Sequence, residues 1–111
     1  MILSENREDE LRKFATKIRL NTLRTLNHLG FGHYGGSLSI VEVLAVLYGE
    51  IMPMTPEIFA SRDRDYFVLS KGHAGPALYS TLYLNGFFDN EFLYSLNTNR
   101  TKLPSHPDRN L

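Results

Sequence analysis

The sequence contains no cysteine among its 111 residues. This absence excludes disulfide bonds, thiolate nucleophiles and sulfur-ligated zinc, and it fits a reducing compartment, so we expect the chain in the cytoplasm. No apolar run approaches the roughly 20 residues that a membrane helix requires, because Glu42, Tyr48 and Gly49 interrupt the longest stretches. The start of the chain lacks the pattern of a signal peptide, since acidic residues follow Leu3 almost at once. We therefore expect a soluble protein with no membrane partner.

An excess of charge of one sign is also lacking. The 12 basic residues balance the 12 acidic ones, and neither kind forms a long run, so the sequence predicts no nucleic-acid partner. The hydrophobic content of 42%, with Phe 7 and Tyr 6, is ordinary for a globular protein. At this length we expect at most one domain, residues 1–111, with enough chain to bury a core.

Apolar residues at mostly three- and four-residue spacing predict a long amphipathic helix over residues 6–28. Its buried face would carry Leu11, Phe14, Ile18, Leu23 and Leu26. Acidic residues crowd its start and basic residues its end, as the helix dipole favours, and Gly30 can close it in the left-handed conformation.

A second helix is predicted to begin at Ser39. The S-x-x-E spacing of Ser39 and Glu42 is that of a capping box, in which each side chain binds a free amide of the first turn. The interior of this helix is almost wholly apolar, which predicts burial on most sides until Pro53 ends it.

One strand is predicted at residues 66–69, a short apolar run typical of a strand buried on both faces in a parallel sheet. Two helices should follow, one from Pro76 to about Gly86 and a short one capped by Asp89, before a polar loop from Asn97. A single strand cannot satisfy its own backbone, so we expect the other strands to come from elsewhere. The fold class predicted is α/β, with helices packed on a mostly parallel sheet that is incomplete in this chain.

Three of the four histidines lie beside glycine or proline in predicted loops; they are His33, His73 and His106. His73 lies between the predicted strand and a helix, where open α/β sheets bind ligands and helix amides favour an anion. The alternative is that all three are surface or capping histidines. His28, near a helix end, is expected to pack or to complement the dipole. The histidines have no acid at a recognised ligand spacing, so a zinc site is weakly supported.

Three successive stretches resemble the N-terminal motifs of transketolases. They are GHYGGSLS at residues 32–39, DYFVLSKGHAGPALY at residues 65–79 and HPD at residues 106–108. The resemblance runs from about Ile18 to Asp108 and implies the start of a thiamine diphosphate-binding domain. It also implies a transferase that moves a two-carbon ketol unit between sugar phosphates, using thiamine diphosphate and usually Mg²⁺.

The same resemblance implies roles for individual residues. His33 and His73 would be catalytic and would lie beside the cofactor together with Gly36, with His73 near the diphosphate. His33 and His106 would contact the sugar substrate. Imidazole suits these roles, because it can donate a hydrogen bond to an anion and titrates near neutral pH. The family commonly has proline where this chain has Tyr34, whose ring could narrow access to the site.

The sequence ends before the family's Gly-Asp-Gly motif for the metal and diphosphate, and it lacks the domain whose glutamate activates the cofactor. The resemblance therefore implies that no metal ligand lies in this chain. The expected partner is the remaining transketolase segments or a C-terminal subunit, in a homo- or hetero-oligomer, and we expect the chain alone to be inactive. Two alternatives stay open: a related deoxyxylulose phosphate synthase, disfavoured by the turn at residues 70–73, and a catalytically dead interaction module.

Overall fold

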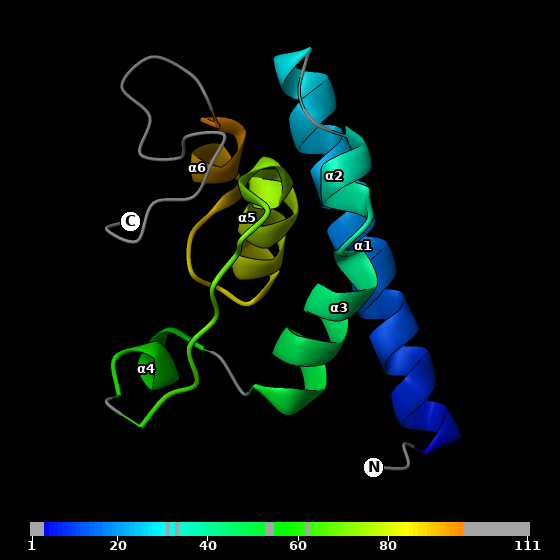
Figure 1. Ribbon diagram of the computed structural model, residues 1–111, viewed down its shortest axis with the longest axis vertical. Coiled ribbons are helices and arrows are strands. Elements are labelled where there is room, and N and C mark those ends of the chain that lie inside the picture. The colour runs from blue at the N-terminus through cyan, green and yellow to red at the C-terminus, as the bar shows by residue number, and fades with distance from the viewer. Residues whose placement is uncertain (1–3, 31, 33, 53–54, 62, 97–111) are drawn as a thin grey trace.

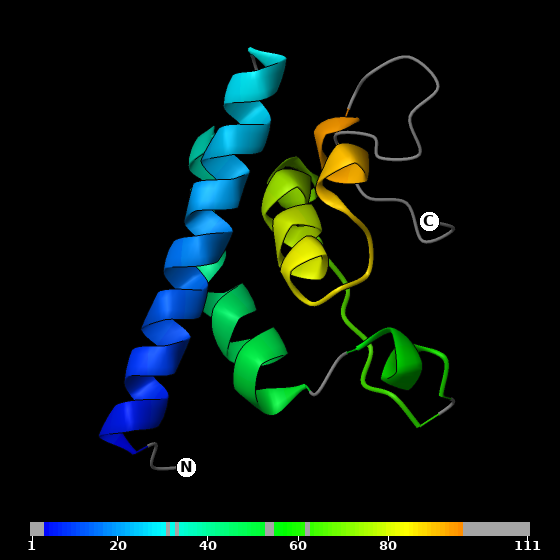
Figure 2. The same ribbon diagram turned by 180° about the vertical axis from the view of Figure 1, so that it is seen from behind.

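The computed structural model describes residues 4–30, 32, 34–52, 55–61 and 63–96, and this part of the chain is built from helices (Figure 1). In chain order these are α1 (Glu5–Leu29), α2 (Tyr34–Leu38), α3 (Val41–Val46), the π-helical turn η1 (Leu47–Ile51), α4 (Pro56–Phe59), the 3₁₀ turn η2 (Gly72–Ala74), α5 (Gly75–Leu84) and α6 (Asn90–Tyr94). The long α1 runs along one side, with α2, α3 and α5 packed on it and α6 against α5 (Figures 1 and 2).

The predicted long helix is confirmed as α1, and its end signals act as expected. The Ser4 hydroxyl accepts a hydrogen bond from the Arg7 amide at 3.1 Å. Gly30, with φ of 86°, donates its amide to the carbonyl of Leu26 at 2.9 Å. The buried face carries Leu11, Ala15, Ile18, Thr22, Thr25 and Leu26. Leu23 is 36% exposed, so its place on the buried face is a wrong prediction; at roughly 100° per residue, position 23 turns away from that face.

The second helix is present, but the predicted capping box is wrong. Ile40 precedes α3 and makes no side-chain cap. The Ser39 hydroxyl instead donates to the carbonyl of Gly36 at 2.8 Å, and Glu42 forms an ion pair with Arg19 of α1. Both side chains therefore bind residues of other helices. A local sequence pattern does not reveal such contacts.

Helix α3 continues through η1, and fewer of its residues are buried than predicted. Val41, Leu44 and Tyr48 are buried, whereas Val43 is 56% and Ile51 is 51% exposed. The helix therefore has one covered face and one open face in this chain. Pro53, its predicted stop, lies outside the described residues.

Gly49 allows η1 to approach α1 closely. A Cβ atom at this position would lie 2.9 Å from Cδ2 of Leu11 and 3.0 Å from Cδ2 of Phe14. Arg7 fastens the same contact, because its guanidinium donates to the carbonyl of Gly49 and to the carboxylate of Glu50. The beginning of α1 is thus held against η1.

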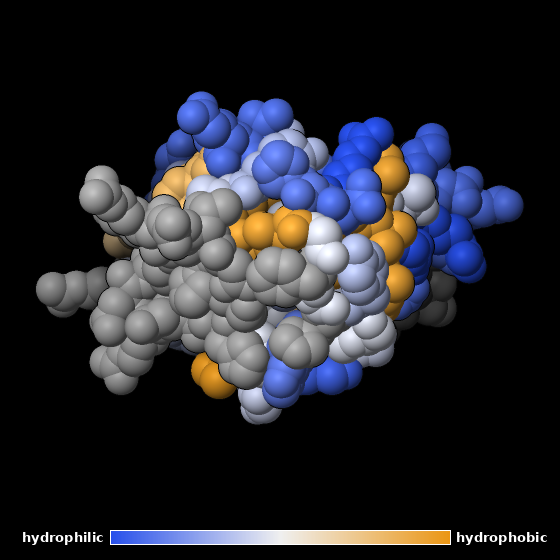
Figure 3. All heavy atoms as spheres, turned by 90° about the horizontal axis from the view of Figure 1, so that it is seen from above, coloured by the Kyte–Doolittle hydropathy of each residue, from blue (hydrophilic) through white to orange (hydrophobic). Residues whose placement is uncertain are grey.

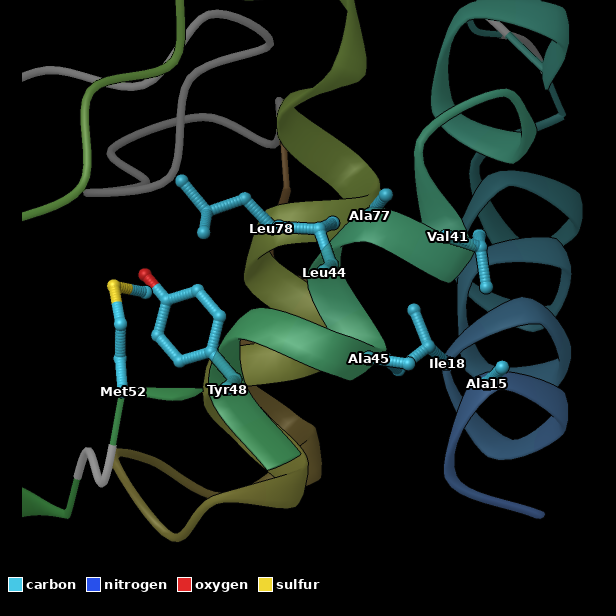
Figure 4. Packing of buried hydrophobic residues seen from close by; sticks show 9 residues of the cluster. All are labelled: Ala15, Ile18, Val41, Leu44, Ala45, Tyr48, Met52, Ala77 and Leu78. Carbon is cyan, nitrogen blue, oxygen red and sulfur yellow. The ribbon is translucent and has the colours of Figure 1, made fainter. Parts of the chain in front are cut away.

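The main core lies between α1, α3 and α5. Ile18 of α1 lies beside Ala45 of α3 (Figure 4). The ring of Tyr48 meets Phe67 edge-on with centroids 5.7 Å apart, and burial raises the pKa of the Tyr48 phenol to about 12. A second cluster of Tyr79, Leu93 and Leu96 holds α6 against α5.

The predicted strand at residues 66–69 is not paired, and no strand occurs among the described residues. Residues 64–69 have no regular secondary structure and run as an extended trace toward η2 (Figure 1). Phe67 and Leu69 pack against the core, whereas Tyr66 is 68% and Val68 is 84% exposed. Burial on both faces is therefore not seen in this chain, because the neighbouring strands expected from elsewhere are not among the described residues. The parallel sheet is not confirmed.

The two helices predicted after the strand are confirmed as α5 and α6, with the expected residues at their ends. Pro76 lies in the first turn of α5, which ends before Gly86 with φ of 87°. The Asp89 carboxylate accepts from the Phe92 amide at 2.9 Å and caps α6. The sequence pattern does not predict α2 or α4, which are both short.

None of the helices in the described part of the chain has the length and apolar character needed to cross a membrane. The predicted loop from residue 97 lies outside the described residues.

Candidate functional site

Two turns that are distant in the sequence meet where α2 packs on η2 and the start of α5. His73 is exposed in η2, directly before the ten-residue α5, as the sequence places it. A methyl group placed on Gly36 of α2 would lie 3.7 Å from Cβ of His73 and 3.8 Å from its carbonyl oxygen. The structure thus brings together two of the residues that the resemblance assigns to the cofactor.

Lys71 and Ser39 join the same two turns. The Lys71 ammonium donates to the Ser39 hydroxyl at 2.7 Å, across 32 positions of the chain. That hydroxyl in turn donates to the carbonyl of Gly36. Cε of Lys71 would lie 3.8 Å from a methyl group on Gly36. The sequence pattern assigned Ser39 to a helix cap and gave Lys71 no role, although Lys71 stands two residues before His73.

The electrostatic setting suits an anion. Lys71 forms no ion pair with a carboxylate of the described residues. The first turn of α5 has no side-chain cap and carries the positive end of the helix dipole, although the Gly75 amide donates to the Gly72 carbonyl and Pro76 has no amide proton. An exposed imidazole and an ammonium group therefore lie on one turn beside the positive end of the α5 dipole, a setting that fits part of a diphosphate site.

The described residues contain no group of three or more His, Asp or Glu that could hold a metal ion. His33 and His106 lie outside the described part of the chain, so their expected contacts with cofactor and sugar stay predictions. His28 is exposed and its ring lies 5.1 Å from that of Tyr94, which gives it the packing contact expected for it.

A shallow pocket of about 310 Å³ lies elsewhere, lined by Leu23, Arg24 and Asn27 of α1 and by Tyr34 of α2. It includes neither His73 nor Gly36. Few polar groups converge on this pocket, so its lining does not resemble that of a typical ligand site. Tyr34 is 38% exposed and lines this pocket beside α1.

One buried hydroxyl in α2 lacks a partner. The Ser37 side chain is fully buried, and its Oγ makes no hydrogen bond within the described residues. Nearby helices satisfy their buried hydroxyls: Thr22 donates to the carbonyl of Ile18 at 2.7 Å, and it lies 3.3 Å from Ser80. Ser37 is thus an unpaired polar group beside the candidate site, in the same short helix as Gly36.

Comparison of the sequence with known proteins identifies the family of this chain. Residues 11–111 match the domain described as "Transketolase, thiamine diphosphate binding domain". The chain is 51% identical over 106 residues to a 6-deoxy-6-sulfo-D-fructose transketolase subunit of Clostridium sp. (strain MSTE9), covering 96% of this chain and 38% of the relative.

Two further relatives extend the comparison. A subunit of the apulose-4-phosphate transketolase of Phocaeicola vulgatus is 43% identical over 76 residues, which are 68% of this chain and 27% of the relative. The transketolase of Treponema pallidum is 33% identical over 102 residues, 91% of this chain and 15% of the relative. The chain thus spans well under half the length of these curated relatives. It belongs to the transketolase family and carries sequence of that family's thiamine diphosphate binding domain.

Proposed function

We propose that this chain supplies one wall of the thiamine diphosphate site in a transketolase-type enzyme that transfers a two-carbon ketol unit between sugar phosphates. The observation that carries the proposal is the turn at residues 71–75. It presents an exposed His73 beside Gly36, within the residues that match the family's cofactor-binding domain.

The residues of this turn would act by binding and orienting. His73 can donate a hydrogen bond to a diphosphate oxygen, and the positive end of the α5 dipole lies on the same turn. Gly36 keeps the space beside His73 free of a side chain. The carbanion chemistry belongs to the cofactor when it is bound.

The rest of the site would come from other protein. We propose that Mg²⁺ ligands and the glutamate that activates the cofactor lie in further segments or in a partner subunit, because no metal cluster occurs in the described residues. Relatives that are named as transketolase subunits support such a partner. Their names also favour transketolase over deoxyxylulose phosphate synthase. The cysteine-free composition supports a cytoplasmic assembly.

The test uses a restored assembly, in which residues 11–111 of this chain replace the matching stretch of the Clostridium subunit, together with the remainder of that enzyme. We expect this assembly to bind thiamine diphosphate in a calorimetric titration and to transfer a ketol unit from a ketose phosphate to an aldose phosphate. The 111-residue chain alone should show no transfer. A restored assembly that folds but binds no cofactor, or turnover by the purified chain alone, would contradict the proposal.

A second candidate is an interaction module without catalysis, and surface composition supports it. Large apolar side chains are exposed in the described residues; they are Leu20, Leu23, Tyr34, Val43, Ile51, Phe59, Tyr66 and Val68. Figure 3 shows hydrophobic residues reaching the surface between hydrophilic ones. This candidate predicts partner binding without cofactor binding, so the same titration separates it from the first.

A further inference from the structure

The two turns of the candidate site are joined by a short chain of hydrogen bonds. The Lys71 ammonium donates to the Ser39 hydroxyl at 2.7 Å, and the Ser39 hydroxyl donates to the Gly36 carbonyl at 2.8 Å. Lys71 precedes η2, whereas Ser39 follows α2. These hydrogen bonds are therefore a direct polar link between the segments that carry Gly36, in α2, and His73, in η2.

This link uses the hydrogen-bonding capacity of each group. A serine hydroxyl has one proton and two lone pairs, so it can accept from Lys71 while it donates to Gly36. The helix that follows gains nothing from Ser39, since Ile40 takes the capping position without a side-chain bond. Ser39 is thus committed to the contact between the turns.

We propose that Lys71 is a positioning residue, which acts through Ser39 to hold the glycine turn of α2 against the turn that carries His73. This inference rests on the proposed function. Lys71 has no carboxylate partner among the described residues, so the hydroxyl is the contact that fixes its ammonium group. With the link broken, α2 and the segment before η2 lose a polar contact, and the position of Gly36 relative to His73 becomes less fixed.

The test is a double-mutant cycle in the restored assembly, with thiamine diphosphate affinity measured by calorimetry. Lys71→Met and Ser39→Ala should each weaken binding about three- to tenfold, and the double variant should be no weaker than the stronger single one. Lys71→Arg should restore most of the affinity, because a guanidinium can also donate to Ser39. Lys13→Met is the matched control, since Lys13 is an exposed lysine of α1, and it should bind as the parent does.

A second measurement needs no cofactor. In the cofactor-free assembly, hydrogen–deuterium exchange should rise in both segments, residues 34–39 and 70–75, for Lys71→Met and equally for Ser39→Ala. Parent binding of the cofactor tests the proposed function separately. If the parent binds and Ser39→Ala also binds as tightly, or if the two effects add, Lys71 acts by direct contact with the ligand and the positioning role is wrong.

Discussion

His73 and His28 are the same residue type in different surroundings, so they make a matched pair for substitution. His73 lies on the turn before α5, whereas His28 lies against Tyr94 near the end of α1. A hydrogen bond to a charged group contributes about 1.5–3 kcal/mol, so His73→Ala should weaken thiamine diphosphate binding about ten- to hundredfold in the restored assembly. His28→Ala should leave the affinity within about twofold, since it removes only a ring contact. Calorimetric titration gives both values, and equal affinities would remove His73 from the cofactor site.

Two glycines provide a second residue-level contrast, this time in stability. Gly49→Ala would force a methyl group to within 2.9 Å of Leu11 and 3.0 Å of Phe14, and such overpacking costs about 1–3 kcal/mol. Gly35→Ala meets nothing within 4 Å and lies in α2, where alanine favours the helix by about 0.5–1 kcal/mol. Urea unfolding of the chain should therefore shift to lower concentration for Gly49→Ala alone. A Gly49→Ala variant as stable as the parent would show that η1 and α1 are not so close.

Among the elements, α6 depends on one cap and one apolar contact. Asp89 accepts the Phe92 amide, and Leu93 and Leu96 are buried against the cluster around Tyr79. Asp89→Ala should lower the unfolding free energy by about 1 kcal/mol, because a free amide of the first turn loses its partner. Asp89→Asn keeps a capping oxygen and should stay within about 0.3 kcal/mol of the parent. Thermal unfolding measures both variants, and an equal loss in the two would assign the effect to charge instead of capping.

In helix α3 and the η1 turn that continues it, the neighbouring helices decide which residues are buried more than the apolar sequence pattern does. Val43 and Ile51 lie on this almost wholly apolar stretch, yet they are exposed, because α1 and α5 cover only one side of it. Arg19 reaches Glu42 from α1 and so occupies the side chain that would have closed a capping box. The exposed side of α3 therefore leaves Val43 and Ile51 open to contact with the proposed partner.

For the whole molecule, residues 64–69 offer a test of whether other protein completes the proposed sheet. Val68→Asp should leave the unfolding midpoint of the isolated chain unchanged within error, because Val68 is 84% exposed there. In the restored assembly the same change should sharply reduce the folded yield, since we propose that other strands bury this side chain and an unpaired carboxylate is costly in such a place. Size-exclusion chromatography compares the two yields.

Phe67→Asp is the matched variant for that prediction. Phe67 packs against the core and meets Tyr48 edge-on, so its substitution should destabilise the isolated chain as well as the assembly. Equal folded yields for Val68→Asp and the parent assembly would mean that residues 64–69 do not join a sheet.

Several elements could be predicted from the sequence because their signals are local. The period of apolar residues located α1, Gly30 marked its end, and Pro76 and Asp89 marked the starts of α5 and α6. The motif around His73 pointed to the family, which the match over residues 11–111 bears out. These features depend on side chains and backbone within a few positions of each other, so they do not require particular tertiary contacts.

Other features were decided only by the tertiary structure. Leu23 turned out exposed and Thr22 buried, since the direction of α1 toward α3 and α5 selects the buried stripe. The close approach of the Gly36 backbone to His73 and the bond from Lys71 to Ser39 join positions 32 or more residues apart, so no local spacing could reveal them. The exposure of Val68 has the same origin: a strand is buried by its neighbours, and the described residues provide no neighbouring strand.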